Sequence, residues 1–432
     1  SDGSGLLEAT GKVAFETSGT KLEDAQATGT TFSANGEDAQ ITFAAVIGRR
    51  HGVRFAVPAF AVLALQAAMA TASFRVAGPA APAFWYLQAC VYAMVVALAR
   101  GKATPPWWQV LVTWPASWFI VATFLAIPWG VLGVTTLAWV PFLLAAFGLV
   151  WSLTSRRETV TLDLASPTPE RLARVPEMIR RRRGMSRKPA PGEPHVALRV
   201  VQISDPHLGP FMSEARLRRI CERAVAAEPD LILLTGDYFT RETNAEAEML
   251  GRALAPLGRH PHVFACRGNH DLESPDAVAA GMAAAGVRLL VDESATVTTR
   301  LGKVQIVGMD FHWRDRARTM RGVLVDLVRP AEGLRIVLLH DPGAFHHLPD
   351  GAADLVLSGH THGGHVGLVS LGLDWTAVRA LAGLPDHGAW GQRGNRLYVH
   401  RANGHYGFPL RIGVPAEESV LELIKRPRSL PV

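Results

Sequence analysis

The chain has 432 residues, of which 48% are hydrophobic and only 19% are charged, and its formal net charge is +6. This composition excludes an intrinsically disordered chain, since such chains are poor in apolar residues and rich in charge. Three cysteines exclude a disulfide-built scaffold, and the odd count fits a reducing compartment. The length predicts two or three domains.

The basic excess is confined to one part of the sequence. Residues 1–47 carry seven acidic and two basic side chains, and residues 48–155 carry six basic and no acidic ones. Residues 156–195 carry ten basic and five acidic side chains, while residues 196–432 hold 26 of each sign. A nucleic-acid-binding protein is expected to carry a basic face on its folded domain. We therefore expect no nucleic acid as a partner and favour a membrane surface instead.

Residues 1–47 contain no motif, could form a few strands or a flexible tail, and receive no predicted role. Residues 48–155 are predicted to form an all-α transmembrane block of four helices. The expected spans are residues 55–74, 84–99, 107–128 and 131–151. Roughly 20 apolar residues cross a bilayer core, and soluble helices keep a polar stripe that these segments lack. Eight of the eleven tryptophans lie in this region, several at span ends, as in an interfacial belt.

Basic residues predict the orientation of these spans. Three arginines at positions 49–54 precede the first span and two at 156–157 follow the last, whereas one arginine separates the first and second spans. The positive-inside rule then places both ends in the cytoplasm. This predicts an integral protein of a bacterial inner or plasma membrane with a cytoplasmic C-terminal domain. One span fewer would place that domain outside.

Residues 156–195 are basic and rich in proline, and we expect a juxtamembrane linker there. Within it, residues 169–185 could form a short basic amphipathic helix that lies on anionic lipid. A solvated linker is an equally good interpretation, and both stay open.

From residue 196 onward, short β-rich runs alternate with helical patterns, which predicts an α/β domain over residues 196–432. The expected strands are residues 198–203, 231–234, 263–266, 304–307, 334–339, 355–357 and 397–399. Helical patterns include residues 214–227 and 245–257. The carboxyl ends of such strands are the expected place for a functional site.

Five of these strands are followed by potential metal ligands. The motifs are Asp205-Pro206-His207, Gly236-Asp237, Gly268-Asn269-His270-Asp271, His340-Asp341 and Gly359-His360-Thr361-His362. Any one of them alone is usually a turn or a capping pair, but five in this order indicate a site. Carboxylate, imidazole and amide ligands suit Mn, Fe or Zn. An Asp shared by two ions would give the arrangement used in phosphoryl displacement.

In these motifs the chain resembles the calcineurin-like metallophosphoesterases, and most closely their membrane-associated branch with an N-terminal multi-span region. The resemblance covers about residues 196–425, including Gly308-Met309-Asp310 and residues 408–413. It implies a four-layered α/β/β/α sandwich with two divalent metal ions at one edge. The implied ligands are Asp205, His207 and His362 for the first ion, Asn269, His340 and His360 for the second, and Asp237 between them.

The resemblance also implies the reaction. A hydroxide that bridges the two metals would attack phosphorus, and His270 would contact the phosphate and protonate the leaving oxygen. Two positions depart from the family. Thr240 stands where the protein-phosphatase branch has Asp, which argues against a phosphoprotein substrate. His365 stands where relatives of this branch usually have Gln, and it is either a substrate contact or, as we expect, a surface residue.

Residues 366–390, after the last motif, are unusually apolar. Packing against the sheet is the default interpretation, and a hydrophobic rim that accepts acyl chains from the bilayer is the functional one. The favoured function is a membrane-anchored phosphoesterase that hydrolyses a phosphodiester, pyrophosphate or phosphomonoester in a lipid-linked or nucleotide substrate.

Two alternatives to this function stay open. The chain also resembles enzymes that cleave the pyrophosphate of UDP-2,3-diacylglucosamine in lipid A synthesis, although one branch of these has Arg where His270 stands. The alternative of another class is a catalytically silent membrane sensor or assembly protein. The oligomeric state is not predicted.

Overall fold

The structure is a computed structural model, and its described residues fall in two units, Ser1–Ala68 and Met69–Val432. In the first unit, β1 (Leu6–Glu8) and β2 (Lys12–Ala14) form an antiparallel pair. In the second unit, the described residues are 81–100, 105–133, 136–185, 196–209, 211–240, 246–300, 302–330, 332–405 and 410–424. The first predicted span, residues 55–74, and residues 186–195 of the predicted linker lie outside the described residues.

The described part of the predicted membrane block is helical. Its elements are α2 (Ala81–Arg100), α3 (Pro106–Trp108), a π-helical turn (Gln109–Thr113), α4 (Trp114–Leu125), α5 (Ile127–Val131) and α6 (Val140–Ser152). Among the described helices, only the continuous stretch Pro106–Leu125 is both long and apolar enough to cross a membrane. The helix found in the predicted span 131–151 is shorter than expected, since α6 has only 13 residues. The prediction of four spans therefore stays a prediction.

Helices α4 and α6 pack through small side chains. Val121 and Ala122 of α4 meet Ala145 of α6 in one apolar cluster. The indole Nε1 of Trp118 donates to the carbonyl oxygen of Phe142 at 3.0 Å. Large apolar side chains on the remaining faces of these helices are exposed, among them Trp107, Leu143, Phe147 and Val150. Exposed apolar surface of this extent is typical of helices that meet lipid or another protein.

Two seven-stranded mixed sheets make up the described part of the C-terminal domain. The first has the order β5-β3-β16-β6-β7-β8-β9 and the second the order β10-β11-β12-β13-β15-β14-β4. Their bounds are β3 (Ser155–Asp163), β4 (Ala173–Arg174), β5 (Ile179–Arg183), β6 (Val196–Ile203), β7 (Leu231–Thr235), β8 (Val263–Cys266), β9 (Arg288–Leu289), β10 (Glu293–Thr299), β11 (Gly302–Gly308), β12 (Leu334–Leu338), β13 (Leu355–Ser358), β14 (Gly388–Gln392), β15 (Asn395–Val399) and β16 (Ala416–Ile424). All seven predicted strands are present, with ends that shift by at most two residues.

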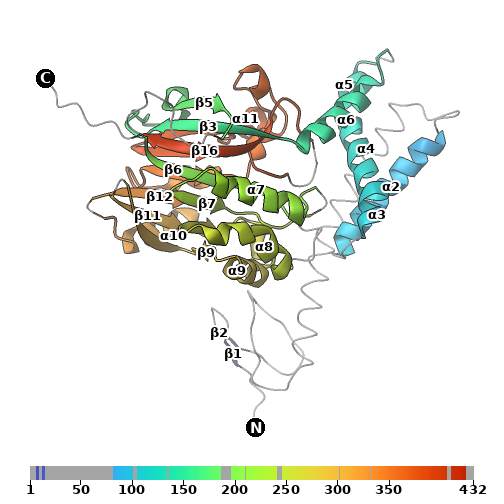
Figure 1. Ribbon diagram of the computed structural model, residues 1–432. Helices are drawn as coiled ribbons and strands as arrows, with labels where there is room; N and C mark the ends of the chain where they lie inside the picture. The colour runs from blue at the N-terminus through green and yellow to red at the C-terminus, as the bar shows by residue number, and fades with distance from the viewer. Residues whose placement is uncertain are drawn as a thin grey trace, which may run out of the picture. The chain divides into compact units, whose positions relative to one another are not determined.

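The two sheets and their helices form four layers (Figure 1). One core lies between the sheets, and a second lies under α7 (Glu214–Ala226), α8 (Ala247–Leu254) and α9 (Pro275–Ala284). A third core lies under α10 (Arg316–Asp326) on the opposite side. Strand β7 shows why its sequence is a continuous apolar run: Leu231 and Leu233 enter the inner core, while Ile232 and Leu234 enter the outer one. The α/β/β/α arrangement implied by the resemblance is therefore confirmed.

The prediction that residues 169–185 could form a short amphipathic helix is wrong. This segment contains β4, a 3₁₀ turn at Pro176–Met178 and β5. In β5, Arg181 binds Glu158 at 2.6 Å and Arg182 binds Glu422 at 2.6 Å. The arginine run therefore compensates carboxylates of the neighbouring strands, and β3 and β5 extend the first sheet across part of the predicted linker.

A buried charge network joins this added edge to the rest of the domain. Arg401 is almost fully buried and contacts both Glu158 of β3 and Glu417 of β16. Its Nε also donates to the carbonyl oxygen of Pro415 at 3.1 Å. A buried arginine with these partners is stabilising chiefly because its loss would leave carboxylates uncompensated.

We predict that Arg401→Leu lowers the free energy of unfolding by about 3–5 kcal/mol, the usual cost of breaking a buried pair. The matched control is Arg156→Leu, because Arg156 contacts the same Glu158 at 3.7 Å from an exposed position. That change is expected to cost no more than about 1 kcal/mol. Denaturant unfolding of the detergent-solubilised chain, followed by tryptophan fluorescence, measures both. Equal effects of the two changes would contradict the prediction.

Candidate metal centre

The carboxyl ends of strands from both sheets meet at one edge and carry the predicted ligands. Asp205 and His207 follow β6, and Asp237 follows β7 of the same sheet. His340 follows β12, and His360 and His362 follow β13 of the other sheet. The carbonyl oxygen of Ser358 accepts a hydrogen bond from Nε2 of Gln202 at 3.0 Å, which ties β13 to β6 at this edge.

The first ligand group combines Asp205, His207 and His362, whose ligand atoms all lie within 4.8 Å of one another. Nε2 of His207 and Nε2 of His362 are 3.2 Å apart, and Nε2 of His362 is 3.4 Å from Oδ1 of Asp205. All three residues are buried. Two imidazole nitrogens and a carboxylate that converge at these distances can hold a divalent ion.

The second ligand group combines Asp237, His340 and His360. Nε2 of His340 is 3.2 Å from Oδ2 of Asp237 and 3.2 Å from Nδ1 of His360. The same Oδ2 of Asp237 is 3.6 Å from Nε2 of His207 in the first group. Asp237 therefore lies between the two groups, where one carboxylate can serve both ions.

Backbone carbonyls fix the orientation of two ligand histidines. Nδ1 of His340 lies 2.7 Å from the carbonyl oxygen of Thr235, and Nδ1 of His207 lies 3.2 Å from that of Phe239. A proton on Nδ1 leaves Nε2 free to bind a metal, which is how outer-shell partners select the ligand tautomer.

The predicted ligand Asn269 also fits a metal. The two residues that flank Asn269 hydrogen-bond to buried carboxylates. The amide of His270 donates to Oδ1 of Asp237 at 2.9 Å, and the amide of Gly268 donates to Asp271 at 2.7 Å. Oδ1 of Asn269 is buried and has no hydrogen-bond partner among the described residues. A buried amide oxygen usually has a partner, and a cation beside Asp237 would supply one.

Burial sets the protonation states in this centre. It lowers the pKa of His207 to about 3 and that of His360 to about 4, so both imidazoles are neutral at pH 7, as metal ligands must be. Burial opposes a charge on His340 too, but the Asp237 carboxylate outweighs it and raises the pKa of His340 to about 10. Burial also raises the pKa of Asp205 to about 6. Divalent cations would compensate the buried carboxylates directly.

Backbone strain is concentrated in the ligand residues. The left-handed φ values are 48° for Asp205, 48° for His207, 57° for Asp237, 67° for His360 and 52° for His362. This conformation is uncommon for any residue other than glycine and costs about 1–3 kcal/mol where the surrounding structure imposes it. It turns the chain sharply off each strand so that the side chains converge. Gly359 must also lack a side chain, because a Cβ there would lie 2.1 Å from Oδ2 of Asp205.

Asp271 organises the loops and was assigned no role from the sequence, although it belongs to a recognised motif. Its buried carboxylate accepts hydrogen bonds from the amides of Asp237 at 2.7 Å, Tyr238 at 2.8 Å and Gly268 at 2.7 Å. Burial and the charge of Asp237 raise the pKa of Asp271 to about 7. These bonds join the ends of β7 and β8 at the metal centre.

Arg411 is a second positioning residue that sequence reasoning missed. It is fully buried, and its guanidinium donates to the carbonyl oxygens of His362 at 3.0 Å and of Arg401 and Gly404 at 2.8 Å. It lies in the C-terminal motif that carried part of the resemblance, which was the available signal.

His270 lies at the edge of the centre. Its side chain is half-buried, its ring centroid is 5.4 Å from that of His207, and its Nδ1 is 3.5 Å from Oε1 of Glu273. Burial opposes a charge on this ring, but Glu273 and Asp237 outweigh it and raise the pKa of His270. A larger protonated fraction at neutral pH suits a general acid.

Thr240 and His365, the two residues that depart from the family pattern, both lie in defined environments. Thr240 is buried, and its Oγ1 donates to the carbonyl oxygen of Leu208 at 3.0 Å. The expectation that His365 is a surface residue is wrong. Its half-buried ring stacks on that of His362 at 5.1 Å, and its Nδ1 lies 3.0 Å from the carbonyl oxygen of Leu410.

The default interpretation of residues 366–390 is also wrong in large part. Trp390 does pack in the core, at 6% exposure. An exposed apolar band instead comprises Leu368, Leu371, Leu373, Trp375 and Leu381. These side chains leave a hydrophobic surface on the segment that directly follows the last predicted ligand.

We predict that Asp271→Asn weakens metal binding by about tenfold to a hundredfold, as is typical when an outer-shell partner is lost. The side-chain amide keeps the shape but can accept on only one atom, so one of the three backbone donors loses its partner. Elemental analysis after dialysis against graded Mn²⁺ measures the effect. Asp276→Asn, an exposed change in the first turn of α9, is the matched control. Undiminished metal content in Asp271→Asn would contradict the assigned role.

Comparison with known proteins identifies one family model and several relatives that this chain resembles. Residues 198–364 match the family model for calcineurin-like phosphoesterase. Phosphodiesterase YaeI of Escherichia coli is 28% identical over 234 residues, which cover 52% of this chain and 82% of that protein. UDP-2,3-diacylglucosamine pyrophosphatase LpxG of Chlamydia trachomatis is 24% identical over 286 residues, which cover 53% and 84%. A transmembrane protein with metallophosphoesterase domain of Danio rerio is 28% identical and covers 51% and 52%.

Proposed function

Since this chain contains a calcineurin-like metallophosphoesterase domain and is a metal-dependent phosphoesterase, we propose that it hydrolyses a phosphodiester or pyrophosphate bond in a lipid-linked substrate at a membrane. The observation that carries this proposal is the pair of ligand groups joined by Asp237, beside a segment with an exposed apolar band. The first feature supports the chemistry, and the second supports the substrate class.

Two divalent ions are the proposed cofactors, and Mn, Fe and Zn all suit the ligand set. The residues that would hold them are Asp205, His207 and His362 on one side, Asn269, His340 and His360 on the other, and Asp237 between. When bound, the ions would act as Lewis acids that activate water and neutralise phosphoryl charge. Asp237 is the residue on which both groups depend, because its Oδ2 is close to a histidine of each.

His270 is the proposed general acid. Its amide is anchored on Asp237, so its ring stays beside the ligand groups, and Glu273 holds a positive charge on it. From this position it can contact a phosphoryl oxygen and give a proton to the leaving oxygen.

The apolar helices support a membrane anchor. The stretch Pro106–Leu125 is long and apolar enough to span a bilayer. Helix α6 also carries exposed apolar side chains, at Leu143, Leu144, Phe147 and Val150. We propose that residues 48–155 anchor the chain in a bacterial inner or plasma membrane, with the phosphoesterase domain on the cytoplasmic side. The arginines that flank the region support this orientation.

Two substrate types have specific support. The likeness to LpxG supports a UDP-diacylglucosamine-like pyrophosphate, and the likeness to YaeI supports a phosphodiester. The silent-sensor alternative has less support, because all the predicted His and Asp ligands are present and converge.

We predict that Asp237→Asn abolishes both metal loading and metal-dependent hydrolysis of bis-p-nitrophenyl phosphate, since it removes the charge shared by the two groups. His270→Ala is expected to keep both ions and to lose turnover of a dialkyl phosphodiester by about 10²–10⁴-fold, the usual contribution of a positioned acid to a leaving oxygen that needs a proton. Elemental analysis and phosphodiesterase rates separate the two variants. Loss of the ions in His270→Ala would show that it is a ligand support and not an acid.

We also predict that lipid-linked phosphates or pyrophosphates in detergent have at least about tenfold higher kcat/KM than water-soluble nucleotide diesters, because the acyl chains bury more apolar surface on binding. A panel of both classes, assayed with Mn²⁺, measures this. Equal values would reject the lipid-linked substrate and leave the phosphoesterase intact. A wild-type chain with about two bound ions and no hydrolysis of any phosphoester would instead favour the silent sensor.

A further inference from the structure

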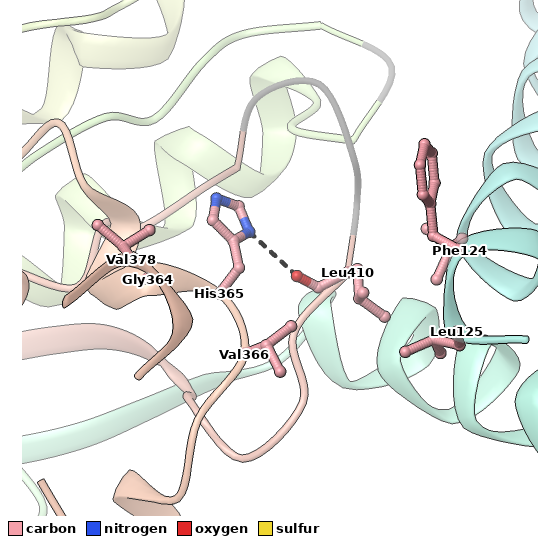
Figure 2. Close-up of a pocket in the computed structure, with 8 residues that line it drawn as sticks. Phe124, Leu125, Gly364, His365, Val366, Val378 and Leu410 are labelled. Atoms are coloured by element: carbon pink, nitrogen blue, oxygen red, sulfur yellow. Dashed lines mark hydrogen bonds between the residues drawn. The ribbon is translucent and has the colours of Figure 1, made fainter. Parts of the chain in front are cut away.

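An apolar cavity of about 460 Å³ lies where α4 meets the segment that follows the last predicted metal ligand (Figure 2). Helix α4 contributes Val121, Phe124 and Leu125, and the phosphoesterase domain contributes Val366, Val378 and Leu410. None of these six side chains carries a polar atom. Soluble ligands such as nucleotides need several polar groups in a site, so this lining selects a hydrocarbon.

The single polar side chain in the lining points to the metal centre. His365 lines the cavity, and its ring stacks on His362 with centroids 5.1 Å apart and planes 16° apart. Nδ1 of His365 is held by the carbonyl oxygen of Leu410, as the dashed line in Figure 2 shows. Only one imidazole ring therefore separates this end of the cavity from a residue of the first ligand group.

The opposite wall of the cavity belongs to the apolar helix. Phe124 is 42% exposed and lies in the stretch Pro106–Leu125 that is suited to span a bilayer. In the sequence, most of the exposed apolar band lies between Val366 and Val378, which line the cavity. The band includes Leu371, which is 75% exposed. The helix and the segment that carries the exposed apolar band thus both contribute to the wall of the cavity.

We propose that this cavity binds an acyl or alkyl chain of the substrate while its phosphate lies at the metal centre. The proposal rests on the proposed function and deepens it, since it assigns the recognition of the hydrocarbon to α4 together with residues 364–378. A chain in this cavity would also orient the phosphoester, because its polar end would emerge at His365 beside His362. The membrane helix is then part of the binding site as well as an anchor.

The test uses p-nitrophenyl alkyl phosphodiesters with chains from methyl to octyl and the full-length chain in nanodiscs. Hydrolysis of the P–O bond to p-nitrophenol releases p-nitrophenolate and leaves an alkyl phosphate, so every substrate has the same leaving group. Each buried methylene contributes up to about 0.8 kcal/mol, or roughly threefold to fourfold in kcat/KM. We expect kcat/KM to rise at least about tenfold from methyl to octyl in the wild type.

Two variants fill the cavity from different elements. Val378→Phe from α11 (Ala377–Ala382) and Val366→Phe are each expected to lower the octyl-to-methyl ratio of kcat/KM at least about tenfold. Because the readout is a ratio within one protein, a partly inactive preparation does not mimic the effect. Val325→Phe, an exposed change on α10, is the matched control and should keep the wild-type ratio.

The outcomes separate the two levels of the proposal. A flat dependence on chain length in the wild type, or an unchanged ratio in both filling variants, would overturn the acyl-chain cavity while the phosphoesterase stands. Absence of metal-dependent hydrolysis for every member of the series would instead count against the proposed function itself. A lower ratio in both filling variants but not in Val325→Phe would support the cavity.

Discussion

The buried carboxylate of Asp271 holds together the two loops from which the metal centre is built. It draws three backbone amides, those of Asp237, Tyr238 and Gly268, to one point at the ends of β7 and β8. This fixes the direction of the Asp237 side chain, whose Oδ2 faces His207 on one side and His340 on the other. The spacing of the two ligand groups therefore depends on a residue that belongs to neither group.

Such support is needed because the ligand residues are strained. Asp205, His207 and Asp237 follow one sheet and His360 and His362 follow the other, and all five have left-handed backbones. At about 1–3 kcal/mol each, this strain is comparable with the whole stability of a typical domain. The three well-packed cores offset it, and ions that bind only the folded chain would add further stability by mass action.

The sequence predicted those parts of the fold that are local. Strands such as β7 are buried on both faces, so their apolar runs were recognisable, and the ligands follow directly after such strands. Strand β16 was missed because it contains Glu417, Glu418 and Glu422, which look unsuited to a central strand. Their charges are compensated by arginines about 15 to 240 positions away, including Arg401, Arg223 and Arg182. Only the folded chain brings those partners together.

The same distinction applies to the site. The identities of the ligands followed from motifs, and the resemblance ordered them into two groups. The stacking of His365 on His362 joins residues only three positions apart, but it depends on the left-handed backbone of both residues, which no pattern in the sequence encodes. The cavity beside α4 depends on contacts between segments more than 200 residues apart. The sequence could not show that Leu368, Leu371, Leu373, Trp375 and Leu381 are exposed, because leucine and tryptophan occur both in cores and on surfaces.

The direct junction of α6 with β3 has a consequence for how the enzyme meets its substrate. Only Leu153 and Thr154 separate the helix from a strand that pairs over nine residues with β16, inside the first sheet. A domain on a flexible tether samples a volume of solution, but a domain joined in this way cannot. The two linking residues leave the domain little freedom to move away from the end of α6. With the membrane anchor proposed above, phosphoesters at the membrane surface would reach the ligands before those free in solution, and selection by position would precede selection by chemistry.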